Sequence, residues 1–147
     1  MPLIQLLYAS EAVGVLPYGS LVGIMSHAQV QNPARGITGM LCYGSGQFLQ
    51  ALEGEREAVT ALYHQIALDP RHEHCQLLSV TEIARRDFPE WSMKVVNWED
   101  GDSARRRAIL AADTGRNVFA PLQMRASEAA TFLRHMADLE RELTRDD

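Results

Sequence analysis

The sequence predicts an α+β fold built on a five-stranded sheet, and three observations support this prediction. Apolar runs of strand length begin at Leu3 and recur four more times before residue 98. Two of these runs flank the turn residues Gly44-Ser45-Gly46, which is a strong hairpin signal. Two amphipathic helical stripes separate the other runs. The order is β-α-β-β-α-β plus one more strand, a ferredoxin-like arrangement with both helices on one face of the sheet.

The predicted elements follow from local patterns, taken in order along the chain. The first strand covers residues 3–9, where apolar side chains on both faces indicate a central, buried strand. A helix follows and is expected to stop at Asn32-Pro33, because the residue before a proline disfavours the helical region. The other elements are a helical stripe at Leu21, Ile24, Met25 and Ala28, strands at 37–43 and 47–53, a helical stripe at Ala58, Leu62 and Ile66, and strands at 76–83 and 92–98.

The chain changes character after residue 98. A polar break at 99–103 leads to a short helix that ends near Ala112, and a longer helix covers 126–143. The longer helix has apolar residues spaced by three and four at Ala129, Phe132, Met136, Leu139 and Leu143. This stripe fits a dimer seam or a helix packed on the free face of the sheet, because it spans only about two heptads. We therefore predict a domain at 1–98 and a helical extension at 99–147 that is not an independent domain.

Composition argues against several classes of function. A net charge of −5 disfavours a broad nucleic-acid surface. No apolar run approaches the roughly 20 residues that cross a membrane, and the N-terminus lacks the pattern of a secretory signal, so we expect a cytoplasmic protein. Cys42 and Cys75 have no metal-type spacing and are expected to be reduced core residues. The 69–74 run, which holds two histidines, lacks matching distant ligands, so we predict no metal site.

Two polar side chains fall on strand faces that are otherwise apolar. Gln50 lies between Phe48 and Leu52 on one face of the third strand, and Tyr8 lies in the first strand. A buried amide or hydroxyl without a partner costs about 1–3 kcal/mol, so each needs one. Taken singly, each residue is more often structural than functional. Because the first and third strands of this fold are adjacent, we expect both to face the same helix-covered side and to outline a polar-lined pocket.

Other polar residues allow two interpretations each. Asn32 is a favoured helix-terminating residue, but its amide also offers a donor and an acceptor to a ring edge. Arg71 and His72 suit a short polar loop and equally suit contact with a phosphate. The sequence contains no G-x-G-x-x-G, Walker loop or G-x-S-x-G elbow.

At these residues the sequence resembles the BLUF family, the blue-light sensors that use FAD. The resemblance spans about residues 2–98 and rests on five blocks in order. They are Leu-Leu-Tyr-Ala-Ser at 6–10, Asn32 with Gly-Ile-Thr-Gly-Met-Leu at 36–41, Gly-Gln-Phe-Leu-Gln-Ala-Leu-Glu-Gly at 46–54, Asp-Pro-Arg-His at 69–72 and Phe-Pro-Glu-Trp-Ser-Met at 88–93. Gln31 departs from the pattern, because relatives often carry Asn or His at this position.

The resemblance implies that FAD, or alternatively FMN or riboflavin, lies between the two helices over the sheet. It implies that Tyr8 is the photochemical electron donor and that Gln50 bridges Tyr8 to the flavin. Trp91 and Met93, placed two residues apart on one strand face, are implied to report the light state by rearranging. The other implied flavin contacts are Ile24, Gln31, Asn32, Phe48, Asp69, Arg71 and His72.

We therefore expect a blue-light photoreceptor that is not an enzyme. Its output is expected to be light-dependent binding to a separate effector protein, or altered self-association of a homo-oligomer, through the C-terminal helices. One alternative is a flavin-free, ferredoxin-like interaction module. A less favoured one is an acylphosphatase-like hydrolase that uses Arg35 and Asn32 around an anion.

Overall fold

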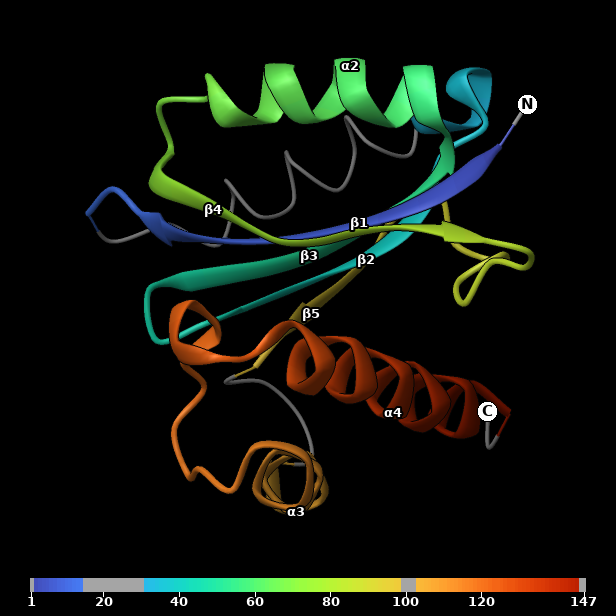
Figure 1. The fold of residues 1–147 in the computed structure, drawn as a ribbon. Helices are drawn as coiled ribbons and strands as arrows, with labels where there is room; N and C mark the ends of the chain where they lie inside the picture. Colours follow the sequence, from blue (N-terminus) through green and yellow to red (C-terminus); the bar gives the residue numbers. More distant parts are fainter. Residues whose placement is uncertain (1, 15–30, 99–102, 146–147) are drawn as a thin grey trace.

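The computed structural model describes residues 2–14, 31–98 and 103–145, which form a five-stranded sheet with helices on both faces (Figure 1). The strands are β1 (Leu3–Ala12), β2 (Thr38–Gly44), β3 (Gln47–Glu55), β4 (His72–Ile83) and β5 (Lys94–Asn97). Their order across the sheet is β4-β1-β3-β2-β5. All neighbours are antiparallel except β2 and β5, which are parallel. The predicted α+β, ferredoxin-like fold is confirmed, with β1 and β3 adjacent at its centre.

The helices lie on two opposite faces of this sheet. Helix α2 (Arg56–Ala67) covers one face, and α4 (Ala126–Arg145) covers the other, as Figure 1 shows. Helix α3 (Ser103–Thr114) and the short η1 (Pro121–Gln123) complete the C-terminal part. Among the described helices, none has the length and apolar character needed to cross a membrane.

The apolar stripe of α4 packs inside the chain. Ala129, Phe132 and Met136 are fully buried and share one cluster with Leu49 of β3 and Leu110 of α3. The stripe is therefore used to cover the sheet, and our alternative of an exposed dimer seam is wrong. The sheet has a second apolar face that needs burial, and the helix supplied by the same chain covers it.

Strand alternation divides the interior into two clusters. The cluster toward α2 contains Ile4, Leu6, Tyr8, Leu41, Phe48, Leu52 and Met93, among others. The cluster toward α4 contains Leu7, Met40, Cys42, Leu49 and Ala51 together with the C-terminal helices. Burial raises the pKa of Cys42 to about 12, so this thiol stays protonated. The sheet thus separates two clusters, and consecutive residues of a strand face different ones.

Two turns decide where strands and helices end. The β2–β3 hairpin turns at Ser45 and Gly46, both at positive φ (51° and 74°), which confirms the predicted Gly-rich turn. The predicted helix stop at Asn32-Pro33 is wrong, because residues 31–35 are helical. The chain leaves this helix at Gly36, whose φ of 66° suits a C-terminal glycine. The predicted stripe from Leu21 to Ala28 lies outside the described residues.

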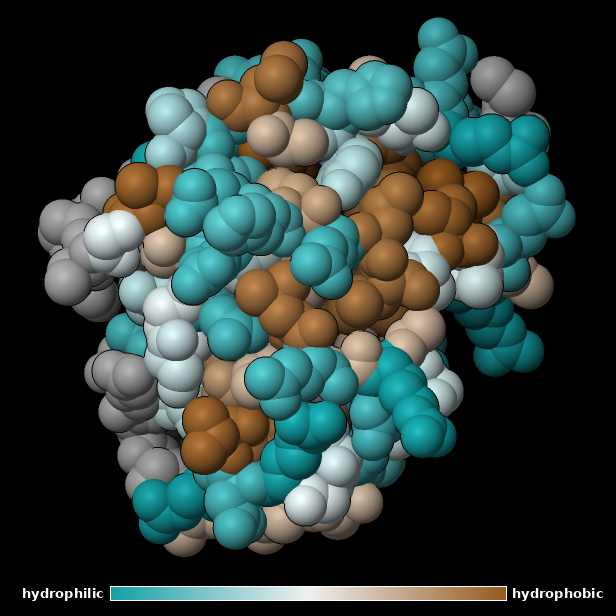
Figure 2. Space-filling view, turned by 60° about the vertical axis from the view of Figure 1, so that its left-hand side comes forward, coloured by the Kyte–Doolittle hydropathy of each residue, from teal (hydrophilic) through white to brown (hydrophobic). Residues whose placement is uncertain are grey.

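Strand β4 is one of the two edge strands of the sheet, and β5 is the other. It begins at His72, earlier than predicted, whereas β5 is shorter than predicted and begins only at Lys94. Leu77 and Val80 of β4 are about half exposed, at 53% and 52%. On the face drawn in Figure 2, apolar side chains gather near the centre and hydrophilic ones surround them. An edge strand of this kind leaves backbone groups available for contact with another chain.

A buried carboxylate holds the connection between β4 and β5 against the sheet. Glu53 on β3 is fully buried and accepts hydrogen bonds from Gln5 Nε2 (2.8 Å) and from the backbone N–H groups of Asp87 (2.7 Å) and Phe88 (2.9 Å). Thr38 Oγ1 donates a fourth bond at 3.3 Å. Buried carboxylates are costly unless their oxygens are satisfied, and here donors from two strands and the connection supply them.

Replacing Glu53 by Gln is expected to lower the free energy of unfolding by about 2–3 kcal/mol, because an NH₂ group then faces donors that need an acceptor. Urea unfolding measures this loss. Glu55→Gln is the matched control, since Glu55 is exposed on the same strand, and we expect a change within about 0.5 kcal/mol. Equal effects at the two positions would show that the Glu53 network does not hold the connection.

Candidate functional site

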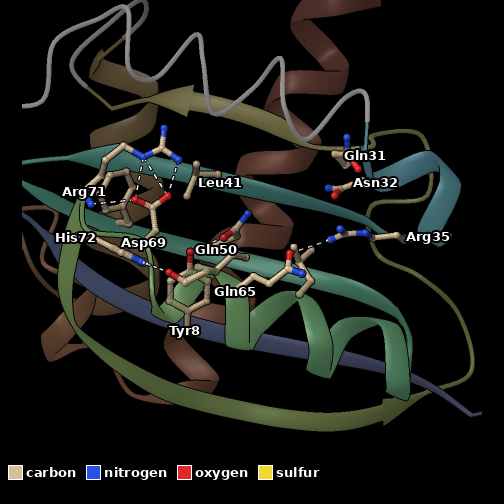
Figure 3. Close-up of a pocket in the computed structure, with 13 residues that line it drawn as sticks. Tyr8, Gln31, Asn32, Arg35, Leu41, Gln50, Gln65, Asp69, Arg71 and His72 are labelled. Carbon is tan, nitrogen blue, oxygen red and sulfur yellow. Dashed lines mark hydrogen bonds and ion pairs between the residues drawn. The ribbon is translucent and has the colours of Figure 1, made fainter.

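A pocket opens between the sheet, α2 and the helical residues 31–35. It is lined by Tyr8, Gln31, Asn32, Arg35, Leu41, Phe48, Gln50, Leu62, Gln65, Ile66, Asp69, Arg71 and His72. Figure 3 shows labelled side chains that come from β1 (Tyr8), β2 (Leu41), β3 (Gln50), α2 (Gln65), residues 31–35 and residues 69–72. The pocket therefore brings together eight of the residues predicted as the site. Of the remaining three, Ile24 lies outside the described residues, Met93 lies behind the pocket wall in the cluster around Tyr8, and Trp91 packs on the other side of the sheet.

Tyr8 and Gln50 form a buried hydrogen-bonded pair at the pocket wall. They are register partners on β1 and β3, which places both side chains on the same face of the sheet. The Tyr8 hydroxyl donates to Gln50 Oε1, and Gln50 Nε2 donates to Met93 Sδ at 3.3 Å. A thioether sulfur accepts but cannot donate, so this contact orients the amide with its oxygen toward Tyr8.

Burial keeps Tyr8 as a neutral phenol. Its side chain is 3% exposed, and desolvation raises its pKa well above the ordinary value of 10. Cys75, Tyr63 and Asp69 raise this pKa further through their charges. The phenol therefore retains a proton, which it donates to the Gln50 carbonyl oxygen.

The rim of the pocket is ordered by two local interactions. Arg71 forms a fork to Asp69, with Nη2 to Oδ2 at 2.5 Å and Nε to Oδ1 at 3.0 Å, and these bonds lower the pKa of Asp69. His72 Nε2 lies 2.5 Å from the Ile66 carbonyl oxygen, which requires a proton on that nitrogen. In the neutral ring, Nδ1 then accepts from the buried Ser10 hydroxyl at 2.7 Å. Ser10 was not predicted as a site residue, although its strand position two residues after Tyr8 was a usable signal.

The segment before β5 crosses from one side of the sheet to the other. Asn32 Nδ2 donates to the Ser92 carbonyl oxygen at 2.9 Å, and Met93 joins the cluster around Tyr8. Trp91 instead packs against the cluster under α4. Our expectation that Trp91 and Met93 share one strand face is therefore wrong. Strand alternation does not apply to them, because β5 begins only at Lys94.

Comparison with known proteins shows that residues 3–94 match the BLUF family, described as sensors of blue light using FAD. The chain belongs to the BLUF family. The matched segment is accordingly a sensor domain rather than an enzyme. This membership confirms the predicted resemblance.

Relatives of this BLUF protein include free-standing and fused sensors. It is 37% identical over 92 residues to photoactivated adenylate cyclase subunit beta from Euglena longa, which covers 62% of this chain and 11% of that protein. The chain thus spans only about a tenth of the length of this curated relative. It resembles the photo-activated state of BlsA (TM-score 0.81, 30% identity, covering 90% of this chain and 93% of that one). It also resembles the dark state of BlrB, a BLUF protein (TM-score 0.70, 34% identity, covering 90% and 96%).

The residues of the pocket fit a flavin. Leu41, Phe48, Leu62 and Ile66 supply apolar surface for a flat ring system. The amide and phenol groups of Asn32, Gln50 and Tyr8 supply donors and acceptors for its polar edge. Leu62 and Ile66 were predicted only as part of a helical stripe, because periodicity cannot tell a core position from a ligand contact.

The raised pKa of Tyr8 predicts a pH dependence of stability. The pKa of Tyr8 in the folded protein lies above the unfolded value of about 10. Above about pH 10 the unfolded state therefore binds fewer protons than the folded state, and the free energy of unfolding falls as pH rises. Tyr8→Phe removes this contribution, so the variant should lose less stability than the wild type over that range. Urea unfolding at a series of pH values measures both slopes. Parallel slopes would contradict the assignment of a buried, neutral phenol.

Proposed function

We propose that this protein is a blue-light photoreceptor that binds FAD and uses Tyr8 and Gln50 to convert light absorption into a changed hydrogen-bond network. The observation that supports this proposal is the buried chain of hydrogen bonds from Tyr8 through Gln50 to Met93. It lies in the wall of a largely apolar pocket in a member of a blue-light sensor family.

Gln50 is suited to act as the switch because its two ends are chemically different. Its oxygen accepts from Tyr8, and its NH₂ group donates to Met93. Rotation of the amide places its oxygen opposite the Met93 sulfur, so two acceptors face each other. A change of tautomer alters the same contacts by moving a proton onto the amide oxygen. Rotation ends the donation to Met93, whereas a change of tautomer leaves one N–H on that nitrogen and ends the donation when this N–H points away from the sulfur. In both cases the segment that carries Met93 senses the state of Gln50.

Tyr8 is suited to act as the reversible electron and proton donor. Excited by blue light, the bound flavin would take an electron and then a proton from Tyr8, and the return of both restores the starting state with no net oxidation. Burial favours this reversibility, because the phenol proton has the Gln50 oxygen as its neighbour rather than bulk water. The rings of Tyr63 and His72 help to exclude water from Tyr8. Their centres lie 5.4 Å and 6.2 Å from the centre of the Tyr8 ring.

The other pocket residues would hold the cofactor. Asn32 and Gln31 would contact the polar edge of the ring system, and Phe48 would pack on its face. Asp69, Arg71 and His72 would lie beside the ring rim and the ribityl–phosphate part. FAD is the proposed flavin because the family uses it, and mass spectrometry of the extracted cofactor distinguishes it from FMN and riboflavin.

The proposed output is light-dependent binding to a separate protein, or a change in self-association. Because the apolar stripe of α4 is buried, it cannot itself be the contact surface unless α4 leaves the sheet. We propose that residues 1–98 sense light and that 99–147 is an extension sharing their core, as the contact of Phe132 with the sheet cluster supports. An acylphosphatase-like activity has no support, since Arg35 and Asn32 bond separately to Gln65 and Ser92.

Purified protein is expected to be yellow, and blue light should shift its flavin band to the red, reversibly in darkness. Tyr8→Phe should retain flavin and abolish the shift, because the electron and proton donor is gone. Gln50→Leu should also bind flavin without a shift. Tyr43→Phe is the matched control, since Tyr43 does not line the pocket, and it should behave like the wild type.

Absorption spectra before and after illumination decide between the alternatives. A colourless protein that gains no colour when mixed with FAD would support the flavin-free interaction module. A full shift in Tyr8→Phe would show that another residue is the donor.

A further inference from the structure

One side chain of α4 holds the segment that carries Met93. Arg141 Nη2 donates to the Asp87 carbonyl oxygen at 2.6 Å and to Glu90 Oε1 at 2.7 Å, and its Nε donates to Glu90 Oε2 at 3.2 Å. Its guanidinium carbon lies 5.1 Å from the centre of the Trp91 ring. Planar, bidentate and stacked contacts of this kind fix both position and orientation. Arg141 also bonds to Asp138 one turn earlier, which steadies it on the helix.

The neighbouring residue holds the other end of the same segment. The carboxylate of Glu140 is nearly buried, and its oxygens lie 3.7 Å from Lys94 Nζ and 3.3 Å from Arg106 Nη2. Lys94 begins β5 and also lies over the Trp91 ring at 5.9 Å. Two adjacent residues of α4 thus hold residues 87–94 from both ends.

The middle of this segment reaches the pocket on the other side of the sheet. The Ser92 carbonyl oxygen accepts from Asn32, and Met93 Sδ accepts from Gln50. The Trp91 carbonyl oxygen accepts from the Gly39 backbone N–H at 3.0 Å. Residues 87–94 therefore contact the proposed switch and the C-terminal helix at once, over a span of eight residues.

We propose that Arg141 is a positioning residue that couples the Gln50–Met93 hydrogen bond to α4. This inference rests on the proposed function, in which light ends the donation from Gln50 to Met93. With that bond present, residues 87–94 are held in one arrangement by Gln50 on one side and by Arg141 on the other. Loss of the bond frees Met93, the segment shifts, and the fork between Arg141 and Glu90 opens. The last turns of α4, which contain Arg141, then lose an anchor to the domain.

Amide hydrogen exchange in the dark and under blue light tests this coupling in the full chain with bound flavin. In the wild type, illumination should raise exchange in residues 86–93 and 137–145 by about fivefold or more, the factor that a lost hydrogen bond of ordinary strength gives. Arg141→Gln should show the raised exchange already in the dark, with little further change in light. Its flavin band should still shift, because Arg141 does not touch the pocket.

Four further variants make the test specific. Glu90→Gln removes the fork from the other side and should reproduce the effect of Arg141→Gln, even if that variant folds poorly. Combined with Arg141→Gln, it should add little, since both changes remove one interaction. Arg141→Lys should restore protection only in part, because lysine keeps the charge but not the fork. Arg134→Gln is the matched control, since Arg134 is exposed two turns earlier on the same helix and bonds only locally to Thr131 among the contacts described; it should match the wild type.

The outcomes separate this inference from the proposed function. A wild-type protein without a light-induced band shift would overturn the proposed function. A normal shift with unchanged exchange in α4 would overturn the coupling alone. So would an Arg141→Gln protein that keeps the full difference between light and dark. In flavin-free protein, Arg141→Gln should still raise exchange in 86–93, and no change there would show that Arg141 does not position the segment.

Discussion

Glu53 places a carboxylate where strands β1, β2 and β3 meet the connection between β4 and β5. Its oxygens accept bonds from Gln5 and from the backbone at Asp87 and Phe88. This fixes the start of a connection whose later residues, Ser92 and Met93, accept hydrogen bonds from Asn32 and Gln50 of the pocket. A buried carboxylate at this position costs desolvation, which its hydrogen bonds offset, and the same bonds fix the path of the chain at Asp87 and Phe88. That path determines where Trp91 lies and how Met93 meets the proposed switch. It also places Glu90 in contact with Arg141 of α4.

The sheet separates the pocket from the cluster under α4, and residues 87–94 contact both sides of it. Gln50 faces the pocket, while its neighbours Leu49 and Ala51 face α4, as alternation along β3 requires. Each side chain of a strand therefore contacts only one of the two clusters. The irregular segment before β5 avoids this constraint, because its residues are not bound to the alternation of a strand. Met93 lies on one side and Trp91 on the other for this reason.

Patterns that depend on local physics predicted most of the fold. Alternation and turn residues located the strands, and the register of β1 with β3 brought Tyr8 opposite Gln50 as expected. The helix stop at Asn32-Pro33 failed because a local proline rule competed with Gly36, which provides a true left-handed end. The stripe of α4 was read correctly as apolar, but spacing alone does not say which surface covers it. Only the second apolar face of the sheet decides that.

The parts of the site that escaped prediction are those that depend on contacts between distant residues. Glu53 and Arg141 are ordinary charged residues in the sequence, and their partners lie 34 and 51 positions away. Of the eight predicted pocket residues, Tyr8 and Gln50 were found from strand alternation, whereas the family resemblance was needed to assign the other six to the site. For Arg141 no such help exists, since it lies beyond residues 3–94 that the family match covers. Sensing in this protein can thus be inferred from shared features, whereas its coupling to α4 must be argued from contacts specific to this chain.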